Sequence, residues 1–219
     1  MEFYLDTANT EEVKKASRLA FLDGITTNPS IIAKEKVDFK TKIQEIATLI
    51  DGKVWCQATG STADAMYDQA IEMNSWGKKM VIKLPMNFEG LVAAGELVKK
   101  DVEVNMTLVN SLSHVVLAAK AGVTYISPYV GRTDDQSFDG QRFIREALQT
   151  IENLKSPTKV IGASIRGPQI AVDLANAGID AITMSFDTFE KMVQSPLTDL
   201  GLAQFTQDWT NYMDDLKGN

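Results

Sequence analysis

The hydrophobic positions of this chain form a repeating two-part pattern. Short apolar runs rich in β-branched residues end in polar residues, and longer stretches with apolar positions three and four residues apart follow them. The short runs are typical of buried strands and the longer stretches of amphipathic helices. We predict strands at Phe3–Asp6, Gly24–Thr27, Lys53–Ala58, Met80–Leu84, Glu103–Thr107, Thr124–Ser127, Lys159–Gly162 and Ala181–Met184.

The stretches between these runs predict helices. Eight strands alternating with helices over 219 residues fit one closed (β/α)8 TIM barrel. An open doubly wound sheet often carries a glycine-rich nucleotide loop, and neither GxGxxG nor GxxxxGK[ST] is present. No linker or low-complexity tract divides the chain, so we expect residues 1–219 to form a single domain. The clearest predicted helices are Thr62–Ser75, Glu89–Lys100, Leu108–Ala121, Gly140–Leu154 and Pro168–Ala177.

The helical pattern continues beyond the eighth predicted strand. Residues Pro196–Lys217 are expected to form an extra C-terminal helix that carries Leu200, Phe205, Trp209 and Met213. An amphipathic helix in this position packs either on its own barrel or on a neighbouring subunit, and the sequence does not choose between the two. A homo-oligomer is therefore a hypothesis.

Composition and charge narrow the classes of function. A net charge of −7 argues against a nucleic-acid partner, because binding phosphates needs a basic face. No apolar run approaches the roughly 20 residues that cross a bilayer, and the first residues lack a signal-peptide pattern, so we expect a cytoplasmic protein with no membrane partner. The single cysteine, Cys56, and the single histidine, His114, cannot make the usual Cys/His zinc site. We predict no metal site and no cofactor. Cys56 is expected to face the surrounding helices, and His114 to have a packing or surface role.

Polar side chains close most of the predicted strands. In a (β/α)8 barrel the chemistry lies at the carboxyl ends of the strands, so these residues are the candidates for a site. Seven of the eight strands contribute. The candidates are Asp6, Thr26, Asn28, Gln57, Lys83, Asn105, Thr107, Ser127, Tyr129, Arg132, Ser164 and Arg166.

Lys83 is the sharpest chemical signal, because it stands inside the apolar run Met80–Pro85. Burial disfavours a charged ammonium, and a neutral amine attacks a ketone to form an imine. The imine nitrogen accepts the electrons released when an adjacent C–C bond breaks. The alternative is a lysine whose stem packs while its amine reaches the rim or pairs with Asp6. The neighbouring strand ends carry hydroxyl and amide groups rather than several carboxylates, so we favour imine chemistry.

Two arginines point to an anion. Arg166 lies in Gly162–Gly167, which is predicted to join a strand to a helix and so adds the Ser164 hydroxyl and a helix N-terminus. Arg132 is predicted on the loop after the preceding strand. Together they form a candidate clamp on a phosphate, whereas a surface salt bridge is the alternative for either arginine alone.

Four further residues are candidates for proton transfer. Imine formation loses water and C–C cleavage moves a proton, so the site needs an acid and a base. A water molecule held by Gln57, Thr107 and Tyr129 is one candidate relay, and Asp6 is a second acceptor. The alternative is that these side chains only satisfy one another at the barrel mouth.

Six segments of the chain carry a family likeness. They are LDTAN at 5–9, GITTNPSII at 24–32, VIKLP at 81–85, ISPYVGR at 126–132, GASIR at 162–166 and QFTQDW at 204–209. With these segments the chain resembles the small fructose-6-phosphate aldolase branch of the transaldolase family over nearly its whole length. The resemblance implies a Schiff base at Lys83, with Asp6 and Asn28 positioning the substrate hydroxyls or assisting proton transfer. It further implies a phosphate site at Arg132, Ser164 and Arg166, and a ring-based homo-oligomer, pentamer or decamer, with exchanged terminal helices.

The resemblance leaves the branch open. Gln57 and Tyr129 resemble the aldolases, where true transaldolases have glutamate and phenylalanine, whereas Asn105, Ser127 and Arg166 resemble the transaldolases. Our first hypothesis is cofactor-free cleavage of fructose 6-phosphate into dihydroxyacetone and glyceraldehyde 3-phosphate. The second is a transaldolase that transfers the dihydroxyacetone unit between sugar phosphates. The third, from another class, is a non-catalytic barrel that binds sugar phosphates.

Overall fold

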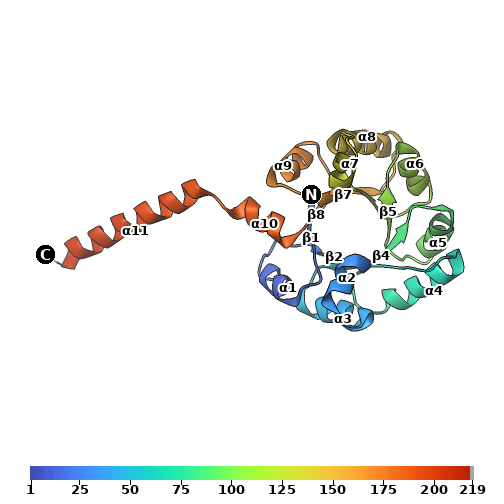
Figure 1. Cartoon of the computed structure of the whole chain (residues 1–219), viewed down its shortest axis with the longest axis horizontal. Helices are drawn as coiled ribbons and strands as arrows, with labels where there is room; N and C mark the ends of the chain where they lie inside the picture. The colour runs from blue at the N-terminus through green and yellow to red at the C-terminus, as the bar shows by residue number, and fades with distance from the viewer. Residues whose placement is uncertain (218–219) are drawn as a thin grey trace.

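Eight parallel strands close into a barrel in chain order, and β8 pairs back with β1. The computed structural model describes residues 1–217. Helices surround the strands as an outer ring (Figure 1). The predicted TIM barrel is therefore confirmed. The strands are β1 (Glu2–Asp6), β2 (Gly24–Thr26), β3 (Lys53–Gln57), β4 (Met80–Pro85), β5 (Val104–Val109), β6 (Tyr125–Pro128), β7 (Lys159–Ile165) and β8 (Ala181–Met184).

Short polar side chains begin most of the helices. Thr62, Asn87 and Ser111 each accept a hydrogen bond from a backbone N–H of the first turn, which satisfies donors that a helix leaves free at its start. The helices are α1 (Thr10–Ala16), α2 (Pro29–Glu35), α3 (Phe39–Leu49), α4 (Ala63–Asn74), α5 (Phe88–Val98), α6 (Leu112–Lys120), α7 (Val130–Asp135), α8 (Gly140–Asn153), α9 (Pro168–Asn176), α10 (Phe186–Val193) and α11 (Pro196–Lys217).

At the end of the barrel where the strands finish, two strands run two or more residues further than predicted, and the other strand ends agree to within one residue. The helix expected from Leu108 begins at Leu112 instead, because β5 continues to Val109 and Ser111 caps the helix. Strand β7 runs to Ile165 rather than Gly162, with an irregular register against β8. The longer strands carry polar side chains further toward the barrel mouth.

Alternation along the strands divides the core into two parts. Side chains that point outward, such as Cys56, pack against the helices in the larger apolar cluster. Cys56 shares this cluster with Val54, whereas Trp55 between them belongs to the barrel interior, so Cys56 faces the helices as predicted. Burial there raises the pKa of its thiol to about 12. Side chains that point inward fill the barrel. Their apolar members are Tyr4, Trp55, Val81, Tyr125, Ile161 and Ala181.

A charged network closes the end of the barrel where the strands begin. Lys53 pairs with Glu103 across 2.5 Å, and Lys159 pairs with Glu2 across 2.5 Å. The Tyr125 hydroxyl donates to Glu2 across 2.8 Å. Each ammonium thus has a carboxylate and each carboxylate a donor. We call this set the lower network; it comprises Glu2, Tyr4, Lys53, Glu103, Tyr125 and Lys159.

Helix α11 spans the predicted residues but does not lie on the barrel. It projects away from it (Figure 1), and none of its residues is buried. Phe205 is 70% exposed and Trp209 is 64% exposed. Of the two arrangements that the sequence left open, packing on its own barrel is absent from this structure. Within residues 1–217, no helix has the length and apolar character needed to span a membrane.

Candidate active site

A cavity of about 90 Å³ lies at the carboxyl ends of the strands. We call it the lysine cavity. It brings together eight of the predicted candidates from strands that are far apart in the sequence. Those eight are Asp6, Thr26, Asn28, Lys83, Ser127, Tyr129, Arg132 and Ser164; the other lining residues are Trp55, Ile161, Ala163 and Thr183.

Lys83 is held inside the barrel without a counter-charge. Its side chain is buried, and its Nζ donates a hydrogen bond to the backbone carbonyl of Thr27 at 2.8 Å. Among residues 1–217, no carboxylate lies within ion-pair distance of this amine. Neither alternative for Lys83, an amine at the rim or a pair with Asp6, matches this arrangement.

The carboxylate of Asp6 accepts a hydrogen bond from a neighbouring hydroxyl group. Thr26 Oγ1 donates to Asp6 Oδ1 at 2.7 Å and lies 2.7 Å from the hydroxyl of Thr183. These side chains come from the adjacent strands β1, β2 and β8. Thr183 was not among the candidates predicted from the sequence. Its position two residues after Ala181, and hence on the same inward face, was the signal that could have found it.

Asn105 and Ser127 form a second pair beside Lys83. Ser127 donates to Asn105 Oδ1 at 2.8 Å, and Asn105 is the register partner of Lys83. Asn105 is fully buried and stands behind Ser127 rather than lining the cavity. Its Nδ2 has no hydrogen-bond partner in the structure. A buried amide donor without a partner costs free energy unless an acceptor reaches it.

The predicted proton relay is only partly assembled. The hydroxyls of Thr107 and Tyr129 lie 2.9 Å apart, so these two residues do meet. Gln57 sits at the end of β3 in register with Lys83, yet it does not line the lysine cavity. In the described part of the chain, no hydrogen bond joins Gln57 to Thr107 or Tyr129.

Asn28 has a structural task as well as its place in the cavity. Its Oδ1 accepts a hydrogen bond from the backbone N–H of Ile31 at 3.0 Å and so caps α2. This bond fixes the orientation of the side-chain amide, and its NH2 group remains available to a ligand.

Backbone geometry brings Ser164 close to Arg132. Ser164 has a left-handed φ of 59°, which is uncommon for a residue other than glycine. A Cβ at Gly131 would meet the Ser164 carbonyl at 2.4 Å, so only glycine allows this approach. Arg132 lies in the short helix α7 rather than on the predicted loop, and its guanidinium lies 4.5 Å from the centre of the Tyr129 ring.

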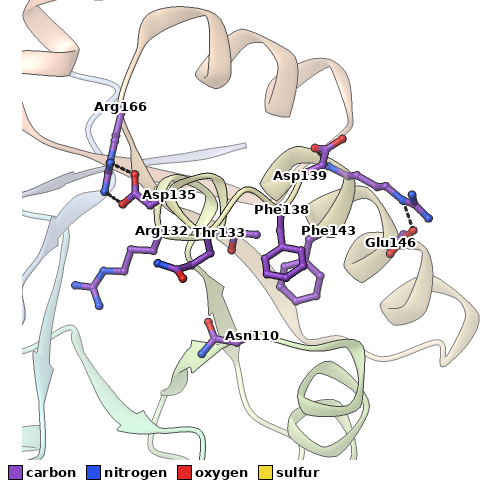
Figure 2. A pocket seen from close by; sticks show the side chains of 11 residues that line it. Asn110, Arg132, Thr133, Asp135, Phe138, Asp139, Phe143, Glu146 and Arg166 are labelled. Carbon is purple, nitrogen blue, oxygen red and sulfur yellow. Dashed lines mark hydrogen bonds and ion pairs between the residues drawn. The ribbon is translucent and has the colours of Figure 1, made fainter.

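A larger pocket of about 870 Å³, whose side chains Figure 2 shows, adjoins the lysine cavity at Arg132, which lines both. We call it the arginine pocket. Arg166 lines this pocket and not the lysine cavity. Its two terminal guanidinium nitrogens, Nη1 and Nη2, donate to the Asp135 carboxylate, Nη2 across 2.6 Å. In this structure Arg166 is therefore engaged in an ion pair, the alternative weighed above. The wall of the arginine pocket also carries Asn110, Thr133, Gln136, Phe138, Asp139, Arg142, Phe143 and Glu146.

His114, for which we expected a packing or surface role, lies in the first turn of α6. Its Nδ1 accepts from the backbone N–H of Asn110, and it lines neither the lysine cavity nor the arginine pocket. Within residues 1–217, no group of three or more His, Cys, Asp or Glu side chains is arranged to hold a metal ion.

Sequence comparisons give relatives along nearly the whole chain. A family model described as transaldolase/fructose-6-phosphate aldolase matches residues 3–216. "Probable transaldolase 1" of Listeria monocytogenes serotype 4b (strain F2365) is 43% identical over 209 residues, covering 95% of this chain and 98% of the relative. "Probable transaldolase" of Maridesulfovibrio salexigens is 43% identical over the same length, with the same coverage.

Comparison with solved structures shows the fold alone. An arginine-to-lysine mutant of flavocytochrome b2 superposes with a TM-score of 0.62 at 14% identity, covering 84% of this chain. This chain spans 56% of that structure's length. A mutant of mandelate oxidase gives a TM-score of 0.59 at 13% identity, covering 84% of this chain and 63% of that one. At such identity the chemistry of these barrels says nothing about this one.

Proposed function

Because the chain belongs to the transaldolase/fructose-6-phosphate aldolase family, we propose that it is a transaldolase that transfers a dihydroxyacetone unit between sugar phosphates through an imine on Lys83. The observation that carries this proposal is the buried Lys83 amine, which has no carboxylate partner and lines a cavity otherwise rich in hydroxyl groups. A barrel that only binds sugar phosphates does not need such an amine, because arginine side chains already suit the phosphate anion.

The first half of the reaction forms and breaks bonds at the donor ketose. The Lys83 amine attacks the C2 carbonyl, and the resulting carbinolamine loses water to give a protonated imine. Asp6 then takes the proton of the C4 hydroxyl. The C3–C4 electrons move to the imine nitrogen, which leaves an aldehyde and an enamine on Lys83. Attack of this enamine on a second aldehyde, followed by hydrolysis of the imine, completes the transfer.

The phosphate end of the sugar fits the arginine side of the site. Arg132 lines both the lysine cavity and the arginine pocket, and Ser164 adds a hydroxyl beside it. In our proposal the three-carbon unit lies in the lysine cavity, and the phosphate reaches Arg132. Arg166 joins the phosphate only if its pair with Asp135 loosens.

Two findings favour transfer over simple cleavage, which was the first hypothesis from the sequence. The similar proteins carry the name transaldolase. In addition, Asn105 and Ser127, which are hydrogen-bonded to each other, are residues in which this chain resembles the transaldolases. The order of the two hypotheses is therefore reversed.

Fructose-6-phosphate aldolase activity is the second candidate. It is favoured by Gln57, which has no carboxylate, and by the phenol of Tyr129 beside Thr107. Both are residues in which this chain resembles the aldolase branch. A phenol near the enamine could protonate it, and hydrolysis would then release dihydroxyacetone.

Two measurements test the proposal. Borohydride added with dihydroxyacetone should leave a covalent adduct whose mass is seen in the intact protein. Fructose 6-phosphate alone should then release little dihydroxyacetone, whereas adding erythrose 4-phosphate should give rapid transfer. Free dihydroxyacetone formed equally fast without an acceptor would establish the aldolase instead. No adduct with any ketose would leave only the sugar-phosphate-binding barrel.

We further propose that a second copy of this chain covers the apolar side chains of α11. The family resemblance implies a homo-oligomer with exchanged terminal helices, and every residue of α11 lacks burial in the single chain. Light scattering should show fewer subunits per assembly when the chain ends at Gln194, and an unchanged number of subunits would reject this role. A cytoplasmic location remains a prediction from the sequence.

A further inference from the structure

Three buried side-chain donors in the described residues have no hydrogen-bond partner. They are the indole nitrogens of Trp55 and Trp76 and the amide nitrogen of Asn105. Trp76 packs edge-on against Phe39 of α3, outside the barrel. Trp55, in contrast, lines the lysine cavity. The indole of Trp55 is thus an unpaired donor at the site of the chemistry, and no signal in the sequence had marked it.

The position of Trp55 makes it part of the cavity floor. It points into the barrel two residues before Gln57, and its register partner on β4 is Val81, two residues before Lys83. Its ring packs against Tyr4 and Tyr125, with centroids 5.1 and 4.7 Å away. The residue therefore separates the lower network from the lysine cavity.

The other polar atoms near Trp55 do not satisfy its indole. The backbone carbonyl of Trp55 already accepts from both the N–H and the hydroxyl of Thr27. The residue is 1% exposed, so bulk water does not reach the indole N–H either. A phenylalanine would also place an aromatic ring here, with a smaller area, and would leave no buried donor unpaired, which is costly. An acceptor that enters the lysine cavity would satisfy the indole N–H.

We propose that the Trp55 indole N–H donates a hydrogen bond to the C1 hydroxyl oxygen of the ketose donor. This inference rests on the transaldolase function proposed above. The bond that breaks must face Asp6, and the leaving aldehyde must pass toward Arg132 and the arginine pocket. With C2 joined to Lys83, the C1 end of the three-carbon unit points the other way, toward the floor. Trp55 is then a determinant of donor specificity.

The test compares dihydroxyacetone with hydroxyacetone, in which a methyl group stands where the C1 hydroxyl would be. The Trp55→Phe variant keeps one aromatic ring and loses the N–H together with the rest of the pyrrole ring, a loss of volume that both ketones experience alike. Its rate of borohydride trapping with dihydroxyacetone should fall about five- to tenfold relative to that with hydroxyacetone, the loss of one neutral hydrogen bond. The matched control is Trp76→Phe, which removes another unpaired indole N–H but should leave this ratio unchanged.

A second measurement uses the wild-type chain and so does not depend on how the variant folds. With ¹⁵N-labelled tryptophan, the indole resonance of Trp55 should move downfield in the dihydroxyacetone adduct and not in the hydroxyacetone adduct. Assignment uses Trp76→Phe and Trp209→Phe.

Two results would overturn the inference. An unchanged trapping ratio in Trp55→Phe, with altered thermal stability alone, would mean that the N–H faces an aromatic ring of the core. An indole resonance that responds identically to both adducts would have the same meaning. In either case trapping of the wild type would still support the proposed function, whereas a wild type that neither ketone labels would contradict both proposals.

Discussion

The two ends of the barrel interior use similar side chains to opposite effect. At the lower end Lys53 and Lys159 each pair with a glutamate. At the upper end, where the strands finish, Lys83 has only a backbone carbonyl as its hydrogen-bond partner. Two buried donors near it, on Trp55 and Asn105, have no partner. One lysine is thus left without the counter-charge that the others receive.

The difference separates stability from reactivity within one fold. A paired and hydrogen-bonded charge is satisfied in the folded chain and has nothing left to offer a ligand. An amine without a carboxylate, next to unpaired donors, still has hydrogen-bonding capacity to offer a ligand. In (β/α)8 barrels generally, the carboxyl ends of the strands hold the chemistry and the amino ends the stability.

Replacing Lys83 gives the largest expected effect. Lys83→Met should abolish trapping with dihydroxyacetone and lower transfer by at least about a thousandfold, because the nucleophile is gone. Intact mass after borohydride treatment measures this. The matched variant is Lys53→Met at the lower end, which should unfold more easily but still form the adduct. If the Lys83→Met variant were trapped as fast as the wild type, the contrast between a reactive upper end and a paired lower end would be wrong.

Tyr129→Phe tests whether the upper end of the barrel supplies a proton-transfer group as well as the amine. It removes the hydroxyl that lies beside Thr107 and keeps the ring under Arg132. If the phenol moves a proton, kcat should fall about 100-fold while KM changes little. Thermal stability should stay close to wild type. A rise in KM with unchanged kcat would make Tyr129 a binding residue instead.

Glu2→Gln tests the lower end through pH. Burial alone would raise the pKa of Glu2, but hydrogen bonds from Lys159, Tyr125 and Tyr4 outweigh it, and the pKa is lowered. The stabilisation from Glu2 is therefore complete above the unfolded pKa, about 4.5, and is lost as the pH falls through the lower folded value. Denaturant unfolding at pH 7 should show a loss of about 1–2 kcal/mol in the variant.

Between pH 5 and strongly acidic conditions, the wild type should lose stability more steeply than Glu2→Gln, because only the wild type carries this group. Transfer activity per folded molecule should not change, since Glu2 lies at the opposite end from Lys83. Parallel pH curves for the two proteins would contradict the assigned role.

Asp135→Asn is expected to have the smallest effect. It releases Arg166 from its ion pair, so the KM for a phosphorylated acceptor should fall about two- to fivefold, in keeping with an exposed pair. The KM for unphosphorylated glyceraldehyde should not change. Glu146→Gln, which breaks the pair with Arg142 in the same pocket, is the matched control. A weaker hold on the phosphorylated acceptor would show that Asp135 orients Arg166 rather than competing for it.

Much of the fold followed from local pattern. Period-two runs place Lys83 inside a strand and Cys56 on the outer face, because alternation alone decides which way a strand residue points. Helix starts at Thr62 and Asn87 likewise depend on nearby residues. The local pattern did not predict the end of β5 at Val109 or that of β7 at Ile165, because both ends depend on partners in neighbouring strands.

The amino-acid sequence by itself determined the barrel, its family and the set of polar strand ends, since all of these depend on residue order. Only the tertiary structure decided which side chains meet. In the folded chain Arg166 pairs with Asp135 and stays outside the lysine cavity. Trp55, with its unpaired indole, forms the floor of that cavity, and Thr183 forms part of its wall. Distances between strands far apart in the chain depend on how the barrel closes, and no local pattern records them.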